Sequence, residues 1–243
     1  MKRTNELYCL KSVKEAIQNP YAEPRIIYSA EEVSNKNIVE KIIKTAYPNQ
    51  LGNEFPDFLC QDGLIEHFEV TSSKENMKGA EFRKNDRHFK KECDCARDNL
   101  IANDFDQGRI IVQRMEMPEL TYSHDNFVKS FKRNFSNHIK RLNSYTGIKT
   151  NSFFLIESVG ATFKVLKKNE YIGEIYLLKY DKILLEYLYQ HRDVLRYVIF
   201  THSNYFEIIE LDNIPQLLKK LNDDISFEAG RMKNVSLNLQ IDI

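Results

Sequence analysis

Alternating apolar and polar side chains mark one stretch of the chain as a β-strand. The pattern runs from Leu64 to Thr71, directly after a turn-forming Gln61-Asp62-Gly63, and a shorter apolar run precedes that turn. An Asp-Gly pair between two such runs predicts a β-hairpin over residues 55–74. Successive residues of a strand point to opposite faces. One face would therefore carry Leu64, Glu66, Phe68 and Val70, and the other Ile65, His67, Glu69 and Thr71.

Apolar residues three and four positions apart predict several amphipathic helices. An early helix would begin at Ser29, which forms a capping box with Glu32, and would end near Ala46. The most regular helix runs from Ser123 to Tyr145. Its apolar stripe consists of Phe127, Val128, Phe131, Phe135, Ile139 and Leu142. Other helices are predicted over 79–102, 181–191 and 213–221, with a short amphipathic piece at 10–17.

Short apolar runs between these helices predict the remaining strands. Continuous runs at 108–113 and 153–157 indicate strands that are covered on both faces. The segments 195–201 and 205–211 would form a hairpin, whereas 173–179 is either a strand or the approach to the next helix. The last twenty residues would be an edge strand or a tail. Helices and strands that alternate without repeats or Gly/Ser linkers predict one α/β domain with elaborations.

The charge balance limits which partners the chain can bind. Acidic and basic residues number 35 each, so the 243 residues carry a formal net charge of zero, and nucleic-acid binding would depend on a local basic patch. Charged residues in the first thirty positions argue against a signal peptide, and no apolar run is long enough to span a membrane. Four cysteines are too few for a disulfide framework. These features predict a cytoplasmic protein without a membrane partner.

A local basic patch occurs on the helix predicted from Ser123 to Tyr145. Five basic residues against one acid, Asp125, give this segment a net charge of +4. At about 100° per residue, the basic side chains gather opposite the apolar stripe. They are Lys129, Lys132, Arg133, Lys140 and Arg141. Such a ridge either contacts nucleic-acid phosphates or is a solvated surface that confers solubility.

Acidic residues near the hairpin are the main candidates for chemistry. Asp57 follows Pro56 at the start of the first strand, and Glu69 lies well along the second. A hairpin can bring these carboxylates together, where they bind a hard cation or raise each other's pKa. His67 shares a face with Glu69 and is either a ligand or base, or a packed side chain. Glu157, at the end of the 153–157 strand, is either a helix cap or a third acid.

The order of these residues resembles the PD-(D/E)XK nuclease superfamily, which has the restriction-endonuclease-like fold. In that family a helix carries an acid, a Pro-Asp starts the motif, and an acid-x-Lys follows on the adjacent strand. The matching residues here are Glu40, Pro56-Asp57 and Glu69-Val70. The resemblance implies an αβββαβ core at about 30–113, with a mixed central sheet flanked by helices, within an α/β domain over 29–222 that has a C-terminal α/β elaboration. Residues 1–28 would be a lead-in, and 223–243 a tail or edge strand.

The resemblance also implies an activity and roles for individual residues. The protein would be a Mg²⁺- or Mn²⁺-dependent endonuclease that hydrolyses DNA, with RNA not excluded, in bacterial or phage restriction, repair or defence. Asp57 and Glu69 would hold the metal and Glu40 would assist. Double-strand cutting needs two active sites, which favours a homodimer.

The sequence departs from the family at the motif lysine, whose position is occupied by Thr71. Lys74 is the nearest basic residue along the chain and would take over its role. Two alternatives follow. Either the enzyme is active with a relocated lysine, or the fold is catalytically inactive and serves as a nucleic-acid- or protein-binding module.

Overall fold

The computed structural model describes most of the chain and leaves several segments undescribed. The described residues are 2–19, 25–29, 36–50, 55–73, 87–88, 91–95, 98, 110–118, 122–159, 162–202, 205–221 and 224–238. Side chains are described within these ranges except at 2–4, 110–118, 162, 173–174 and 230–238. Lys74 and most of the helix predicted over 79–102 therefore lie outside the described residues, although 87–88, 91–95 and 98 are helical.

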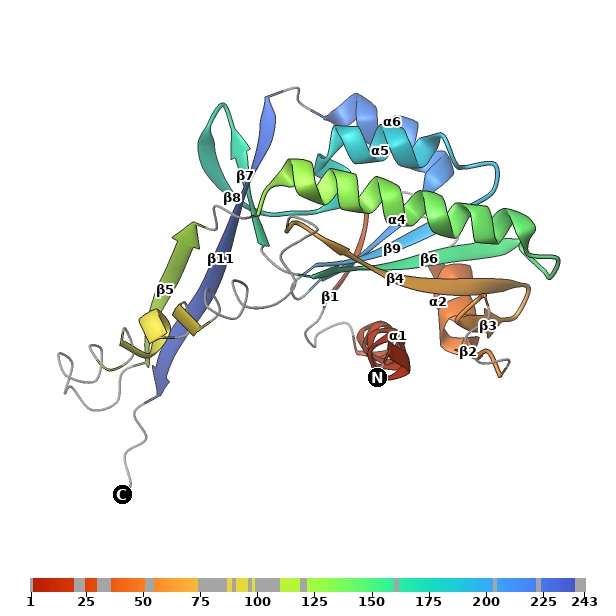
Figure 1. The fold of residues 1–243 in the computed structure, drawn as a ribbon, viewed down its shortest axis with the longest axis horizontal. Helices are drawn as coiled ribbons and strands as arrows, with labels where there is room; N and C mark the ends of the chain where they lie inside the picture. Colours follow the sequence, from red (N-terminus) through yellow and green to blue (C-terminus); the bar gives the residue numbers. More distant parts are fainter. Residues whose placement is uncertain are drawn as a thin grey trace, which may run out of the picture.

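A mixed seven-stranded sheet forms the centre of the described structure (Figure 1). Its order is β1 (Arg25–Tyr28), β10 (Tyr205–Glu210), β9 (Tyr197–His202), β6 (Asn151–Val159), β4 (Gly63–Thr71), β3 (Phe58–Cys60) and β2 (Tyr47–Pro48). The three central strands β9, β6 and β4 are parallel to one another. The neighbours β10 and β3 run antiparallel to them. The predicted α/β class with a mixed central sheet is confirmed.

Helices cover both faces of this sheet (Figure 1). On one face lie α4 (His124–Ser144), α5 (Lys182–Tyr189) and α6 (Ile214–Lys220), with short 3-10 turns at Leu178–Tyr180 and Leu211–Asn213. On the other face lie α1 (Lys2–Gln18) and α2 (Lys36–Thr45). The alternation predicted for β4 is confirmed, since Leu64 and Phe68 pack toward α4, whereas Ile65 packs toward α1 and α2.

The predicted hairpin is formed by β3 and β4, which pair antiparallel. Its two-residue turn is Gln61-Asp62, and Asp62 adopts a left-handed φ of 61°, a conformation that Asp tolerates better than most residues. Gly63 is the first residue of β4 and is not part of the turn. A Cβ added to Gly63 would lie 1.9 Å from the carbonyl oxygen of Asn151, so glycine permits the close approach of β4 and β6 there.

The helix predicted from Ser123 to Tyr145 is also confirmed. Ser123 is its N-cap and accepts a hydrogen bond from the backbone N–H of Asn126, and Tyr145 is its C-cap. The apolar stripe lies against the sheet, and three of its phenylalanines are fully buried: Phe127, Phe131 and Phe135. Asp181 likewise caps α5, the helix predicted over 181–191, by accepting a hydrogen bond from the backbone N–H of Leu184.

The start of the first predicted helix, including Glu32 of the expected capping box, lies outside the described residues, and the helix is described from Lys36 to Thr45. Ser29 directly follows β1, and its backbone N–H donates to the carbonyl of Ile208 on β10. Its hydroxyl donates a hydrogen bond to Glu207 on the same strand. Ser29 therefore contacts a strand far along the chain, which the local sequence did not indicate. The 1–28 lead-in contributes α1 and β1, and both belong to the main fold through α1 packing and β1–β10 pairing.

A second sheet of four antiparallel strands lies beside the first. Its order is β5 (Ile110–Pro118), β11 (Ile225–Asn238), β7 (Thr162–Lys167) and β8 (Glu170–Ile175). The strand expected at 108–113 therefore belongs to this sheet, where β5 pairs with β11. The expectation of an edge strand or tail after residue 223 was wrong, because β11 pairs on both sides, with β5 and β7.

The segment 173–179, for which a strand and the approach to the next helix were both left open, contains the end of a strand and the start of that approach. The strand β8 begins at Glu170 and forms a hairpin with β7 through Lys168-Asn169, where both residues have a left-handed φ. The following residues enter the 3-10 turn at Leu178–Tyr180. None of the helices in the described part of the chain combines the length and the apolarity needed to cross a membrane.

Candidate functional site

Asp57 lies at the entrance to the hairpin and contacts a carboxylate across it. Pairing of Phe58 with Ile65 places Asp57 opposite Glu66. The backbone N–H of Asp57 donates to Glu66 Oε2 at 3.1 Å, and the backbone N–H of His67 donates to Asp57 Oδ2 at 2.8 Å. The carboxylate beside Asp57 is therefore Glu66. We call Asp57 and Glu66 the acid pair.

Two side chains from α4 reach the buried member of the acid pair. Glu66 is only 1% exposed, and its Oε1 lies 2.9 Å from Arg141 Nη1 and 2.7 Å from His138 Nδ1. The His138 ring stacks on Phe68 at 4.3 Å, and the Arg141 guanidinium lies over the Phe55 ring at 5.4 Å. A buried carboxylate needs such partners, because an unpaired buried charge is strongly destabilising.

Burial also changes the proton affinity of both acids. It raises the pKa of Asp57 from 3.8 to about 6, and the neighbouring charge of Glu66 raises it further against the hydrogen bond from His67. Burial raises the pKa of Glu66 from 4.5 to about 7, although the charge of Arg141 opposes this shift. Desolvation disfavours the charged form of each carboxyl, so both protonate more readily than a solvent-exposed acid.

Glu69 does not lie beside Asp57. It is exposed, and it belongs to the opposite face of β4 from Glu66. It also lies three residues beyond Glu66, which is about 10 Å along a strand. Its register partner is Glu157 on the parallel strand β6. The sequence treated Glu66 as a residue that faces away from Glu69, which is confirmed, but the register that pairs Glu66 with Asp57 was not foreseen.

The other residues expected in the site lie elsewhere. Glu40 on α2 accepts a hydrogen bond from the Tyr28 hydroxyl at 2.9 Å and forms ion pairs with Lys36 and Lys44. Thr71, at the position of the family lysine, donates its backbone N–H to Ser130 on α4. The structure thus gives Glu40 contacts with its own helix and with β1, rather than with the acid pair.

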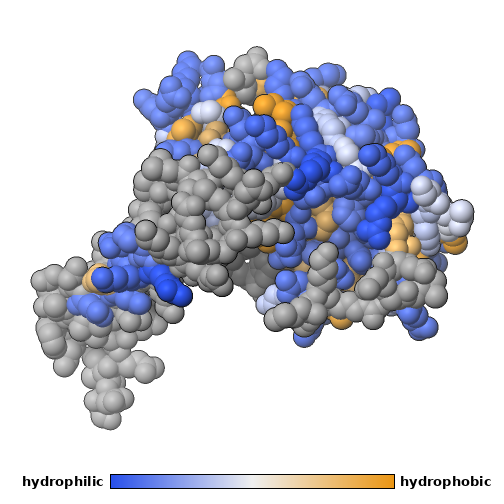
Figure 2. Space-filling model, in the orientation of Figure 1, coloured by the Kyte–Doolittle hydropathy of each residue, from blue (hydrophilic) through white to orange (hydrophobic). Residues whose placement is uncertain are grey.

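The basic residues of α4 divide into two groups. Lys129, Arg133 and Lys140 are exposed on the outer side of the helix. Lys132 lies over the Tyr187 ring at 5.2 Å, and Arg141 is bound to Glu66. The face of the molecule that carries α4 is largely hydrophilic (Figure 2). The predicted ridge is thus present, and Arg141 connects it to the acid pair.

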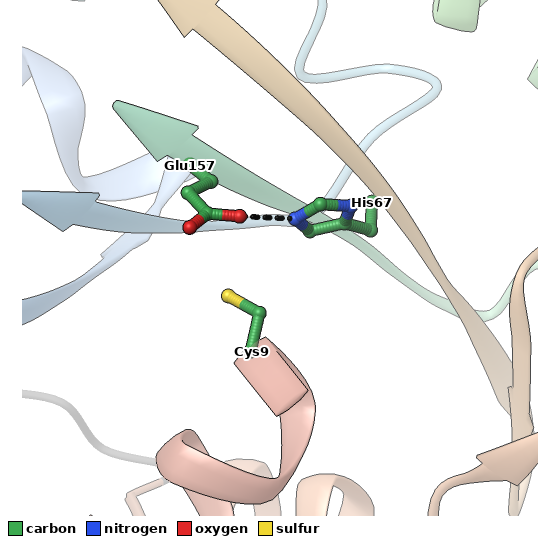
Figure 3. A group of neighbouring side chains, drawn as sticks. All are labelled: Cys9, His67 and Glu157. Carbon is green, nitrogen blue, oxygen red and sulfur yellow. Dashed lines mark hydrogen bonds and ion pairs between the residues drawn. The ribbon is translucent and has the colours of Figure 1, made fainter. Parts of the chain in front are cut away.

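A second polar cluster lies on the face covered by α1. His67 Nε2 lies 3.1 Å from Glu157 Oε2, and Cys9 of α1 is close to both (Figure 3). One donor atom from each residue lies within 4.8 Å of the others. The sequence left open whether His67 is a ligand or base or a packed side chain, and whether Glu157 is a helix cap or a third acid. In the structure these two side chains contact each other. Cys9 was missed, because nothing local in the sequence indicates that α1 packs on these strands.

Comparisons of the chain with known protein families, with curated proteins and with solved structures found no match. The class of this protein is therefore described from its fold and its polar clusters. The described residues form an α/β protein with a mixed seven-stranded sheet, with the acid pair on the α4 side and a Cys-His-Glu cluster on the α1 side.

Proposed function

We propose that this protein is a divalent-metal-dependent nuclease that cleaves DNA, with the acid pair as its metal-binding centre. The observation that carries the proposal is the contact of Asp57 with Glu66 beneath a basic helix. Phosphodiester hydrolysis needs carboxylates that hold a cation and positive charge that binds the substrate backbone. Both kinds of group occur here, and Arg141 joins them.

The order of elements supports a core like that of the PD-(D/E)XK nucleases. Among the elements that form or cover the seven-stranded sheet, the chain passes through α2, β2, β3, β4, α4 and β6, which is an αβββαβ order, with β3 antiparallel and β6 parallel to β4. The helical residues between 87 and 98 and the strand β5 of the second sheet are inserted between β4 and α4. In this arrangement α4 and β6 take the places that the sequence assigned to segments 79–102 and 108–113. The proposed core therefore extends to Val159, with the second sheet as an elaboration.

The donor chemistry of the acid pair fits Mg²⁺ or Mn²⁺. Asp57 and Glu66 offer hard carboxylate oxygens on adjacent strands, and a cation would offset the repulsion between two ionised groups. A bound ion of this kind polarises a phosphate oxygen and lowers the pKa of a coordinated water. His138 and Arg141 hold the Glu66 carboxylate in place from α4. Arg141 also supplies positive charge in place of the family's lysine.

The exposed residues of α4 would bind the DNA backbone. Lys129, Arg133 and Lys140 lie along the outer side of the helix, and Lys140 adjoins Arg141. A phosphate chain on this side would pass close to the acid pair. The surroundings proposed for the activity are those of bacterial or phage restriction, repair or defence. A homodimer is proposed for double-strand cutting.

A second function is favoured by one observation. Glu66 already accepts hydrogen bonds from His138 and Arg141, as a carboxylate does in a purely structural ion pair. Under this alternative the protein is an inactive nuclease-like fold that binds nucleic acid or protein. It would retain DNA binding through α4 but cleave nothing in the presence of metal.

The test is cleavage of supercoiled plasmid, linear duplex DNA and RNA with Mg²⁺ or Mn²⁺. We expect Asp57→Asn and Glu66→Gln to lower the cleavage rate at least about 100-fold, because each removes one negative ligand. Glu69→Gln should retain most of the activity. A larger loss of activity in Glu69→Gln than in Glu66→Gln would contradict the acid pair and would favour Asp57 and Glu69 as the metal ligands.

Asp62→Asn is the matched control, since Asp62 is an exposed acid in the turn of the same hairpin. Asparagine also tolerates the left-handed conformation of that position, so cleavage should be unchanged. Wild-type protein that binds DNA but shows no metal-dependent cleavage of any substrate would favour the binding module. Conversion of plasmid directly to the linear form would support two active sites in a dimer.

A further inference from the structure

We propose that Cys9, His67 and Glu157 form a binding site for a Zn²⁺-like transition-metal ion that fastens α1 to the central sheet. This site is separate from the acid pair and does not depend on nuclease activity. The three residues come from α1, β4 and β6, and they are brought together only by the packing of the helix on the sheet.

The spacing of the donor atoms is close to that of a metal site. In a tetrahedral Zn²⁺ site, ligand distances of about 2.0–2.3 Å separate neighbouring donor atoms by about 3.3–3.8 Å. His67 Nε2 and Glu157 Oε2 lie 3.1 Å apart, and all three donors lie within 4.8 Å of one another. Small side-chain rotations would therefore close the set around one ion. Figure 3 shows that the Cys9 sulfur points from α1 toward the other two side chains.

The kinds of donor select the ion. Thiolate sulfur, imidazole nitrogen and carboxylate oxygen together are typical ligands of Zn²⁺, and of Co²⁺ in its place. Mg²⁺ prefers a shell of oxygen atoms alone. This cluster should therefore discriminate against the ion that the acid pair would bind.

The surroundings of the cluster favour a closed site with one solvent-facing position. Cys9 and His67 are 6% exposed, and Glu157 is partly exposed. Glu69 is the register partner of Glu157 on the neighbouring strand, shares its face and is exposed. Either the Glu69 carboxylate or a water molecule would complete four-coordination from the solvent side.

Metal binding here would stabilise the docking of α1. The helix packs through a short apolar row that includes Leu10 and Val13, both buried against the sheet. A metal bond from Cys9 would add a cross-link between the N-terminal helix and strands more than fifty residues away. Since binding to the folded state alone raises stability, the bound ion should raise the unfolding temperature.

The experiment is a Co²⁺ titration of untagged full-length protein followed by absorption spectroscopy. We expect one equivalent to produce a thiolate-to-metal charge-transfer band in the near ultraviolet and strong visible bands of tetrahedral Co²⁺. Zn²⁺ should displace Co²⁺ and bleach these bands, whereas a large excess of Mg²⁺ should not. Circular dichroism of each variant would confirm that it is folded.

Three variants make the assignment specific. Cys9→Ser should abolish the charge-transfer band, and Glu157→Gln, which keeps the thiol, should weaken Co²⁺ binding at least about tenfold. The matched control is Cys60→Ser, which removes a partly buried free thiol elsewhere and should leave the spectrum unchanged.

Three results would overturn the proposal. They are a wild-type spectrum without a thiolate band, a band that disappears in Cys60→Ser rather than in Cys9→Ser, and equal affinity of wild type and Glu157→Gln.

Discussion

At the scale of single residues, the two carboxyl groups of the acid pair differ in how their charge is balanced. Glu66 is held by Arg141 and His138, whereas the carboxylate of Asp57 accepts a backbone hydrogen bond from His67. Asp57 therefore has the weaker compensation for its ionised form. A divalent cation would supply that compensation, which gives Asp57 the larger dependence on metal in the proposed function.

The raised pKa values predict a pH dependence of stability. Asp57 changes from 3.8 to about 6 on folding, so the folded state holds its proton more tightly than the unfolded state does. Its contribution to stability is present below about pH 4 and is lost as the pH rises through about 6. Between about pH 4 and about pH 7.5, the stability of Asp57→Asn relative to wild type should therefore increase by about 2 kcal/mol.

Urea unfolding of both proteins across this pH range, without divalent metal, measures the effect. Asparagine mimics the protonated acid and still accepts the hydrogen bond from His67. A difference in unfolding free energy that does not change with pH would contradict the pKa assigned to Asp57. Asp62→Asn serves as the control, because Asp62 is exposed.

At the scale of elements, the two sides of α4 have different surroundings. Its inner side buries Phe127, Phe131 and Phe135 against the sheet, which fixes the rotation of the helix. Its outer side then presents Lys129 and Lys140 to solvent. Because the buried inner side sets the rotation of α4, Lys129 and Lys140 are held on its solvent side.

Removal of two exposed lysines from α4 should weaken DNA binding in a salt-dependent way. The slope of log K against log salt concentration is negative for a protein that contacts phosphates. For Lys129→Ala/Lys140→Ala, the slope should become less negative by about 2, roughly one for each lost phosphate contact. Fluorescence anisotropy with labelled duplex at several salt concentrations measures both quantities. Lys41→Ala, on α2 at the opposite face, should leave the slope unchanged. An unchanged slope in the double variant would mean that α4 is only a solvated surface.

At the scale of the whole molecule, the two sheets share one hydrophobic core. Phe163 of β7 packs against Phe127 of α4 at 5.2 Å, and Val165 belongs to the same buried cluster. Phe227 at the start of β11 stacks at an angle of 40° on His124. The end of the second sheet next to α4 is thus part of the main core. The strand β5 and the C-terminal part of β11 extend away from that core (Figure 1).

A shared core predicts that the two sheets unfold together. Phe163→Ala should lower the unfolding free energy by about 3–5 kcal/mol, the usual cost of removing a buried phenylalanine ring. The unfolding should remain a single transition by far-ultraviolet circular dichroism and by tyrosine fluorescence, which is available because the chain has no tryptophan. Ile148→Ala, at a side chain that is 62% exposed, is the control. Two separate transitions, with only one shifted by the variant, would contradict a shared core.

Elements with local signals could be predicted from the sequence. The β3–β4 hairpin depends on a two-residue turn between short runs, and α4 depends on a regular apolar stripe with Ser123 as its cap. The basic side of α4 followed from the same periodicity. These features are set by residues close together in the chain, so local sequence patterns are sufficient to predict them.

The contacts between distant segments are visible only in the tertiary structure. It paired β1 with β10 and β5 with β11, and it placed β6 beside β4 so that Glu157 met His67. It also fixed the register that gave Asp57 the partner Glu66 in place of Glu69. Strand pairing and helix docking depend on packing between residues far apart in the chain, and each one-residue change of register exchanges the faces of a strand. For that reason local patterns in the sequence predicted α4 and the β3–β4 hairpin, whereas the residues that meet in each site follow from long-range packing.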